Sequence, residues 1–276
     1  MIDNEKNIAF WNNNARQSNP EKGMFAGMLT GTSEFDALYR CVSEQETFLS
    51  IFKPTQDMRI LEVGSGGGRW GFWLSDMVGE YVGIDISTEM VEIARREGRR
   101  RKLTNIRFEC STLPDFTGGE EFDLVYFSGV LQCMDDAVVK QCIDKADEIL
   151  RKSGRRKVII SRDTVREVER LEKVGDYPAI FRTVDEYVGF FRENGYVLDR
   201  SELSYVPRRF TTVVSSLYKF PLMNYRRAYA VRETLCKIDE LLGSPKLLKK
   251  KQDRRRGSSP HKTEHKFFKY VKDVAG

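Results

Sequence analysis

Residues 60–74 read ILEVGSGGGRWGFWL, so an acidic side chain, Glu62, stands just before a run of glycines. Gly64, Gly66 and Gly68 follow it at alternate positions. Glycine adopts backbone conformations that other residues avoid and lets the chain come close to a bulky ligand. An apolar run precedes these glycines and a helical pattern follows them. The loop therefore predicts a nucleotide-type ligand at the free N–H groups of a helix N-terminus.

The glycines allow two frames that differ in their ligand. Gly66, Gly68 and Gly71 match the dinucleotide spacing GxGxxG, with Asp85 downstream at a distance suited to a ribose. The other frame begins at Glu62 and puts a carboxylate at the end of the strand. A carboxylate repels a pyrophosphate and attracts an ammonium group. The second frame therefore favours a nucleoside with a cationic tail, S-adenosyl-L-methionine (SAM).

Strand and helix patterns alternate around this loop, which indicates an α/β fold with a doubly wound, mostly parallel sheet. Ser87 and Thr183 are expected to begin helices as N-caps. Near the end of the chain two further strands are expected to complete a seven-stranded sheet with helices on both faces. The seven expected strands are 59–63, 81–86, 105–110, 122–131, 157–161, 196–203 and 265–272.

The chain divides into four expected parts. A helical lid, a SAM-binding core, an insertion and the last strand of the core sheet cover 1–57, 58–205, 206–263 and 264–276. The insertion is expected to be helical around 225–242, because a structureless loop of that length is improbable in a compact domain. Its basic run, Lys249–Arg256, suits either a solvated loop or a contact with an anionic surface.

The composition of the chain narrows the class of protein to which it can belong. Lys and Arg number 46 against 41 Asp and Glu, a net charge of +5. No run of eighteen apolar residues is present, so no integral membrane segment is expected. The polar N-terminus is unlike a signal peptide, so we expect a cytoplasmic protein with five reduced cysteines. Without a CxxC pair, and with two histidines only, no metal site is expected.

Three segments in order, ILEVGSGGGRWGFWL, YVGIDIS and FDLVYFSGVLQCMDD, resemble motifs of the class I, seven-stranded SAM-dependent methyltransferases. The resemblance covers roughly 59–203 and the last strand. It implies SAM as cofactor, with Asp85 at the ribose hydroxyls. The family's acidic residue after the third strand is absent, so Ser111 or a backbone carbonyl is expected at the adenine amino group. The cofactor-binding residues implied are Glu62, Gly64, Gly66, Gly68, Asp85, Ile86, Ser111, Thr112, Ser128 and Gly129, with Trp11 and Arg40 closing over the ligand.

Methyl transfer needs an aligned nucleophile and, for a hydroxyl, a base. Asp163 directly follows the expected strand 157–161 and is the first candidate for that base. A helix N-cap or a surface ion pair is the alternative for this carboxylate. Gln132 is a candidate for orienting the acceptor, and Tyr177 with Arg182 for clamping an anionic or sugar-like group. Ordinary loop contacts are the alternative for these three side chains.

The sequence does not decide between several classes of methyl acceptor. RTVDEYVGFFRENGYVL and HKFFKYVK are similar to segments of bacterial glycan- and sugar-modifying methyltransferases, which favours a small-molecule or glycan hydroxyl, or an amine. Gly27, Gly31 and Asp163 match features of the protein N-terminal methyltransferases, although Gln132 and Cys133 stand where that group has a histidine. An RNA acceptor, a SAM-binding scaffold without catalysis and a nicotinamide oxidoreductase are the remaining alternatives. Nucleic acid is the less favoured partner, because the basic run lacks interleaved aromatic residues.

Overall fold

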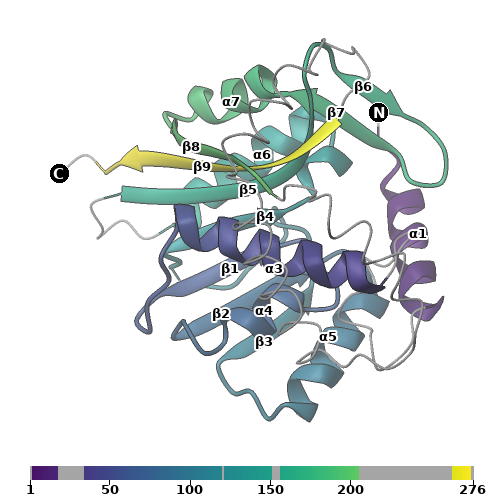
Figure 1. The fold of residues 1–276 in the computed structure, drawn as a ribbon, viewed down its shortest axis with the longest axis vertical. Helices are drawn as coiled ribbons and strands as arrows, with labels where there is room; N and C mark the ends of the chain where they lie inside the picture. The colour runs from purple at the N-terminus through teal and green to yellow at the C-terminus, as the bar shows by residue number, and fades with distance from the viewer. Residues whose placement is uncertain (1, 18–33, 120, 151–155, 205–262, 275–276) are drawn as a thin grey trace, which may run out of the picture.

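The computed structural model describes residues 2–17, 34–119, 121–150, 156–204 and 263–274. Several expectations fall outside these residues: the glycine pair Gly27 and Gly31, the helix around 225–242, the insertion as a whole and its basic run Lys249–Arg256. The described part is one sheet with helices on both faces (Figure 1).

Seven strands form the main sheet in the spatial order β3-β2-β1-β4-β5-β9-β8. The first five pair in parallel, and β9 and β8 add two antiparallel pairs at one side. The predicted α/β class and the predicted closing strand pair are therefore confirmed. The bounds are β1 Arg59–Val63, β2 Glu80–Asp85, β3 Ile106–Cys110, β4 Leu124–Ser128, β5 Arg156–Arg166, β8 Val197–Leu203 and β9 Thr263–Asp273.

The strand count of seven is too low, because two short strands extend the sheet to nine. β6 (Leu171–Lys173) and β7 (Ala179–Thr183) form an antiparallel hairpin, and β7 pairs in parallel with the last two residues of β5. β5 does not end at Ser161 as expected but runs on to Arg166. Its partner β9 lies beside all eleven residues, which keeps the overhang of β5 paired beyond the end of β4.

The parallel strands are joined by helices with clear local start signals. Ser87 caps α5 (Thr88–Arg100) by accepting a hydrogen bond from Met90 N, and Thr183 forms a capping box with Glu186 at the start of α7. α4 (Arg69–Leu74) and α6 (Asp136–Ile149) follow β1 and β4. α7 covers Val184–Glu193.

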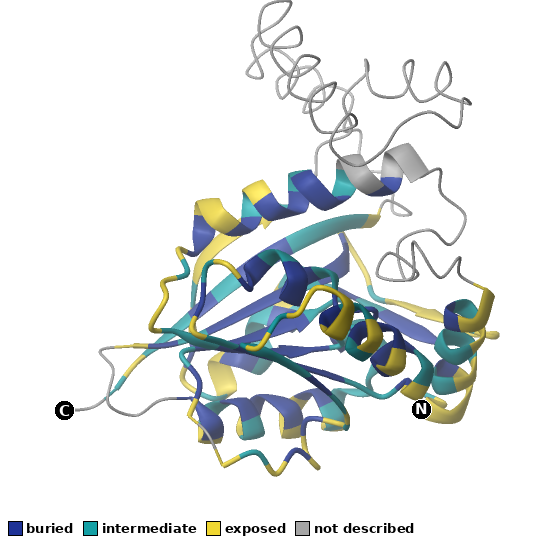
Figure 2. Cartoon of the chain, turned by 90° about the horizontal axis from the view of Figure 1, so that it is seen from below, coloured by how far each residue is buried: buried dark blue, intermediate teal, exposed yellow. Residues whose placement is uncertain are grey.

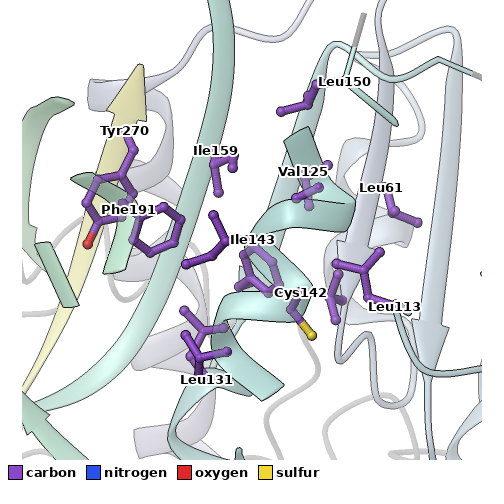
Figure 3. Packing of buried hydrophobic residues seen from close by; sticks show 14 of the residues in the cluster. Leu61, Leu113, Val125, Leu131, Cys142, Ile143, Leu150, Ile159, Phe191 and Tyr270 are labelled. Atoms are coloured by element: carbon purple, nitrogen blue, oxygen red, sulfur yellow. The ribbon is translucent and has the colours of Figure 1, made fainter. Parts of the chain in front are cut away.

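Each sheet face has its own apolar core. On one face α6 and α7 pack against the strands, with Ile143, Phe191 and Tyr270 among the buried residues (Figure 3). On the other face α4 and α5 pack together with α3 (Glu34–Ile51), whose Phe48 ring lies 5.2 Å from Trp70. Figure 2 shows buried strands between helices whose outer sides are exposed.

The two N-terminal helices have different places. α3 lies on a sheet face and contributes to the core, so the structure does not place it as part of a lid. α1 (Asn4–Gln17) runs along the edge of the sheet where the parallel strands end (Figure 1). Because ligands of such sheets bind outside the carboxyl ends of the strands, α1 is the element that can cover one.

Candidate active site

The glycine loop between β1 and α4 folds back onto the neighbouring strand. Gly64 N and Ser65 N both donate to Ile84 O, at 2.8 and 3.0 Å. Gly64 has φ +81°, and a Cβ there would lie 1.9 Å from Val130 Cγ1, so only glycine fits. At Gly66, with φ +52°, a Cβ would meet nothing within 4 Å. The loop is therefore closed toward β2 and β4 and open beside Gly66.

Asp85 ends β2 directly beside this opening. Its Oδ2 accepts from Gly66 N at 2.8 Å, and its Oδ1 accepts from Ser87 N at 2.9 Å. Burial raises the pKa of Asp85, and the hydrogen bonds from Ser87 and Gly66 act against that shift. Each carboxylate oxygen keeps a second acceptor site, so the fixed carboxylate can also accept from the two hydroxyls of a ribose.

Glu62 lies inside the sheet, on the face of α3 and α4, and is fully buried. One of its oxygens accepts a hydrogen bond from the Tyr81 hydroxyl, whereas Oε1 has no partner among the described residues. Burial raises the pKa of Glu62 to about 8, against the opposing charge of Arg69. A bound ammonium would supply the missing donor and favour the ionised carboxylate.

The other expected cofactor residues line the same edge of the sheet. Ser111 N donates to Asp85 O at 3.1 Å, which keeps the end of β3 beside the end of β2. Ile86 follows Asp85 and is half-buried. Thr112 is exposed and its hydroxyl donates to Asp115 Oδ2 at 2.6 Å, so the structure uses it to cap a turn. Gly129, which follows Ser128 at the end of β4, has φ +76°.

Helix α1 is fixed at both ends of the site. Near its C-terminus, Asn12 Oδ1 accepts from Ser87 Oγ at 2.7 Å, and Arg16 pairs with Glu89 at 2.9 Å. At its other end Ile2 N donates to both carboxylate oxygens of Asp135, each at 2.9 Å. α1 therefore crosses the carboxyl edge from the start of α5 to the start of α6.

Trp11 packs inward from α1. It contacts the apolar side of α5 and meets the Tyr177 ring edge-on, with centroids 5.4 Å apart. Phe10 stacks on the same tyrosine at 4.9 Å. The Tyr177 hydroxyl is within 3.0 Å of both Gln132 Nε2 and Cys133 Sγ. Tyr177 thus joins the β6–β7 hairpin to α1 and to the segment after β4, instead of standing free as an acceptor clamp.

Gln132 uses both ends of its amide within the protein. Its Nε2 donates to the Tyr177 hydroxyl at 3.0 Å, and its Oε1 accepts from Thr164 N at 3.1 Å. The side chain therefore connects β5, the hairpin and the end of β4. These two bonds hold the Gln132 side chain in place, and its second N–H and second lone pair are the groups with which it could contact an acceptor.

Arg182, the predicted clamp for the acceptor, makes its hydrogen bonds within the protein. The side chain is fully buried. Its Nε and one terminal nitrogen donate to Asp136 Oδ1 at 2.9 and 2.7 Å. The terminal nitrogens also donate to Leu131 O at 2.8 Å and Met134 O at 2.6 Å. All three nitrogens of Arg182 hold the segment between β4 and α6, so this arginine is structural.

Asp163 lies within β5 and not after its end, because the strand continues to Arg166. It is fully buried, and neither carboxylate oxygen has a partner among the described residues. Burial raises its pKa to about 6, against the nearby charges of Arg162 and Arg182. The alternatives of a helix N-cap and a surface ion pair are therefore wrong for Asp163.

The Ser161 hydroxyl lies close enough to this carboxylate to lower its pKa, and the Asp163 charge acts on the hydroxyls of Tyr187 and Tyr270. None of the three hydroxyls makes a hydrogen bond of ordinary geometry with a described residue. Such a cluster of buried polar groups is costly unless a ligand, a water or a proton transfer satisfies it. Asp163 and these three hydroxyls form the strongest candidate for proton transfer in the described part of the chain.

Sequence reasoning missed an arginine cluster on the opposite face of the sheet. Glu44 of α3 is fully buried, and its two oxygens accept from three arginines. The distances are 3.0 Å from Arg40, 2.8 Å from Arg69 and 3.1 Å from Arg162. Burial opposes the ionisation of Glu44, but the charges of these arginines outweigh it and lower its pKa to about 2. Arg40, expected over the cofactor, is thereby tied to this cluster.

No group of three or more His, Cys, Asp or Glu side chains in the described ranges is arranged to hold a metal ion. Within the same ranges no helix is both long and apolar enough to cross a membrane.

Residues 60–154 match the family model described as "Methyltransferase domain". The uncharacterized methyltransferase YcgJ of Bacillus subtilis is 26% identical over 98 residues, which are 35% of this chain and 38% of that protein. A ubiquinone biosynthesis O-methyltransferase of Pelagibacter ubique is 24% identical over 102 residues, 37% of this chain and 41% of that enzyme. The chain therefore spans about two fifths of the length of these relatives.

Solved structures share the fold over a longer stretch. The [4+2]-cyclase SpnF has a TM-score of 0.56 and 15% identity, covering 84% of this chain and 82% of its own. The complex of DhpI with SAM and HEP has a TM-score of 0.55 and 18% identity, covering 73% and 92%. The matched segment contains the glycine loop, Glu62 and Asp85. Residues 60–154 therefore match a methyltransferase domain, and the Rossmann-like fold that contains them is shared with a solved structure that holds SAM.

Proposed function

We propose that the protein transfers the methyl group of SAM to a hydroxyl or amine of a small-molecule or glycan acceptor, with Asp163 as the general base. The observation that carries the proposal is the pair of carboxylates at the glycine loop. Asp85 is fixed by Gly66 N beside the open side of the loop, and Glu62 has a buried oxygen without a donor among the described residues. This pair suits a ribose and an ammonium, which SAM carries together.

In this reaction the sulfonium of bound SAM supplies an activated methyl group. The protein then has to exclude water, align the acceptor and remove a proton. Helix α1, with Trp11 facing inward, covers the edge where Asp85 and Gly129 lie. A base is most effective when its pKa is near the working pH. The raised pKa of Asp163, about 6, meets that condition.

A small-molecule acceptor is the preferred class because two of the similar proteins are named as ubiquinone biosynthesis O-methyltransferases. The expected likeness to glycan-modifying enzymes supports the same hydroxyl chemistry. Protein and RNA acceptors remain the competing classes, together with an anionic contact through Lys249–Arg256.

A non-transferring SAM-binding protein is the second candidate, and one observation favours it. The fold neighbour SpnF is named as a [4+2]-cyclase, so the fold alone does not determine the reaction. In that case the polar cluster around Asp163 would serve another reaction or none.

Two measurements test the proposal. Calorimetric titration of the full chain with S-adenosylhomocysteine (SAH) is expected to show one binding site, whereas NADH is expected to give no heat. Incubation with methyl-labelled SAM and a cell extract separated into small molecules, protein and RNA is expected to label the small-molecule fraction. Absence of SAH binding would refute the cofactor assignment for the whole chain, and label confined to protein or RNA would refute the acceptor class.

A further inference from the structure

Arg162 reaches the carboxyl edge from the face of the sheet that Asp163 does not use. Side chains alternate along a strand, so these two neighbours in β5 point to opposite faces. The Arg162 side chain is 12% exposed, and its terminal nitrogen Nη1 lies 3.0 Å from where a Cβ on Gly129 would stand. The guanidinium therefore lies directly over the glycine that ends β4.

Only one of the three nitrogens of Arg162 is used by the described residues. Its Nε donates to Glu44 Oε1 at 3.1 Å, whereas neither terminal nitrogen hydrogen-bonds to a described residue. Both terminal nitrogens keep some exposed surface, because neither is a fully buried atom that lacks a partner. The planar end of an arginine that is held by Nε presents a two-pronged donor, the geometry that a carboxylate or phosphate accepts.

Among the described residues, the arginines around Arg162 outnumber the ionised carboxylates that pair with them. Glu44 carries one negative charge and shares it between Arg162, Arg69 and Arg40. Glu62 is close enough to sense Arg69 and Arg162, but its raised pKa of about 8 keeps it mostly neutral at pH 7. The charge of these arginines therefore favours a further anionic group beside Arg162.

We infer that the acceptor carries an oxyanion, a carboxylate or a phosphate, which binds to the terminal nitrogens of Arg162 next to Gly129. This inference rests on the proposed function and names the acceptor's chemical class. The nucleophilic oxygen or nitrogen attacks the methyl carbon, the carbon–sulfur bond breaks with its electron pair left on sulfur, and the nucleophile's proton passes to the base. The oxyanion holds the acceptor and takes no part in bond making.

The test uses the full chain saturated with SAH, titrated by calorimetry with inorganic phosphate, acetate and neutral acetamide. At least one anion is expected to bind in the millimolar range, and acetamide is not. Arg162→Gln is expected to weaken anion binding about tenfold or more, because a hydrogen bond to a charged group is removed. Preference for phosphate or for acetate decides between a tetrahedral and a planar oxyanion.

Arg156→Gln is the matched control, since it removes an exposed arginine at the far end of the same strand, where it pairs with Asp273. It is expected to leave anion and SAH binding unchanged. If Arg162→Gln does not fold, Arg162→Lys replaces it as the test variant, because lysine keeps the positive charge but loses the two-pronged donor. Arg162→Lys is expected to bind the anion more weakly than the wild type. Absence of anion binding, or equal binding by Arg162→Gln, would overturn the inference, whereas loss of SAH binding by the wild type would refute the proposed function instead.

Discussion

Replacing Glu62 by Gln tests how the cofactor's ammonium is bound. The pKa of Glu62 is raised by burial from its ordinary 4.5 to about 8. One pH unit is a factor of ten in ionisation, so the free protein at pH 7 holds this carboxyl about nine-tenths protonated. If the ammonium requires the carboxylate, binding of SAH at pH 7 releases close to one proton from the wild type. Glu62→Gln has no proton to release.

The expected loss of affinity follows from the same pKa. A hydrogen bond between an ammonium and a carboxylate contributes about 1.5–3 kcal/mol. Ionising Glu62 at pH 7 costs about 1.4 kcal/mol, one unit of pKa. The difference leaves at most about 1.6 kcal/mol, so Glu62→Gln is expected to weaken SAH binding at pH 7 by no more than about fifteenfold. The loss grows as the pH rises toward 9, where ionisation costs nothing.

Calorimetry in two buffers of different ionisation enthalpy measures the released protons directly. Glu80→Gln is the control, because Glu80 lies at the opposite end of β2 and pairs with Arg59 and Arg107. It should release protons as the wild type does. A wild-type protein that releases no proton on binding SAH, or a Glu62→Gln variant that still releases one, would show that Glu62 does not meet the ammonium as a carboxylate.

The Glu62 carboxyl also links stability to pH. Its folded pKa lies above its unfolded value, so the native state holds the extra proton between pH 4.5 and about 8. The free energy of unfolding therefore falls as the pH rises through that window. Thermal melts at pH 6 and pH 9 should show a larger drop for the wild type than for Glu62→Gln. Equal drops would mean that burial does not raise this pKa.

Three further changes have separable outcomes. Asp85→Ala removes the acceptor of Gly66 N and the predicted ribose contact, so SAH binding should fall at least about a hundredfold by calorimetry; binding within threefold of the wild type would contradict this. Asp163→Asn should keep SAH binding but lower kcat by about a hundredfold or more. The kcat of the wild type should rise with pH up to about 6 and then level off, because the base must be ionised. An unchanged kcat for Asp163→Asn would exclude Asp163 as the general base. Arg182→Leu removes the donors to Leu131 O, Met134 O and one oxygen of Asp136, which keeps Arg170 as a partner, and should lower the free energy of unfolding by about 1–3 kcal/mol in a denaturant titration. A loss of acceptor affinity at full stability would instead support its predicted clamp role.

Features that follow from local rules were predictable from the sequence. The glycine loop, Asp85 and the caps Ser87 and Thr183 depend on residues within a few positions of one another. The structure places each where the spacing indicated. The closing strand pair was also predictable, because 196–203 and 265–272 have strand-like residues and the family resemblance implies a strand pair after the fifth strand.

Features that depend on distant partners were not predictable. The length of β5 depends on β9, which begins about a hundred residues later, and the pairing of Thr164 with His265 lies in its overhang. That overhang puts Arg162 and Asp163 on opposite faces, a consequence invisible in the segment KVIISRD. Arg182 finds its partner Asp136 46 residues back along the chain. The sequence alone offered no reason to prefer that buried pair over a surface clamp.

The anchoring of α1 has a kinetic consequence. A cofactor bound beside Gly66 would lie near this helix, so its release is expected to require α1 to detach from one end, at Ser87 and Glu89 or at Asp135. The contacts that must open are part-exposed hydrogen bonds and the packing of Phe10 and Trp11 on Tyr177, so detachment is a local opening and does not require unfolding of the sheet. Used cofactor would depart on the timescale of that opening. Turnover then has a ceiling set by a helix that takes no part in the chemistry.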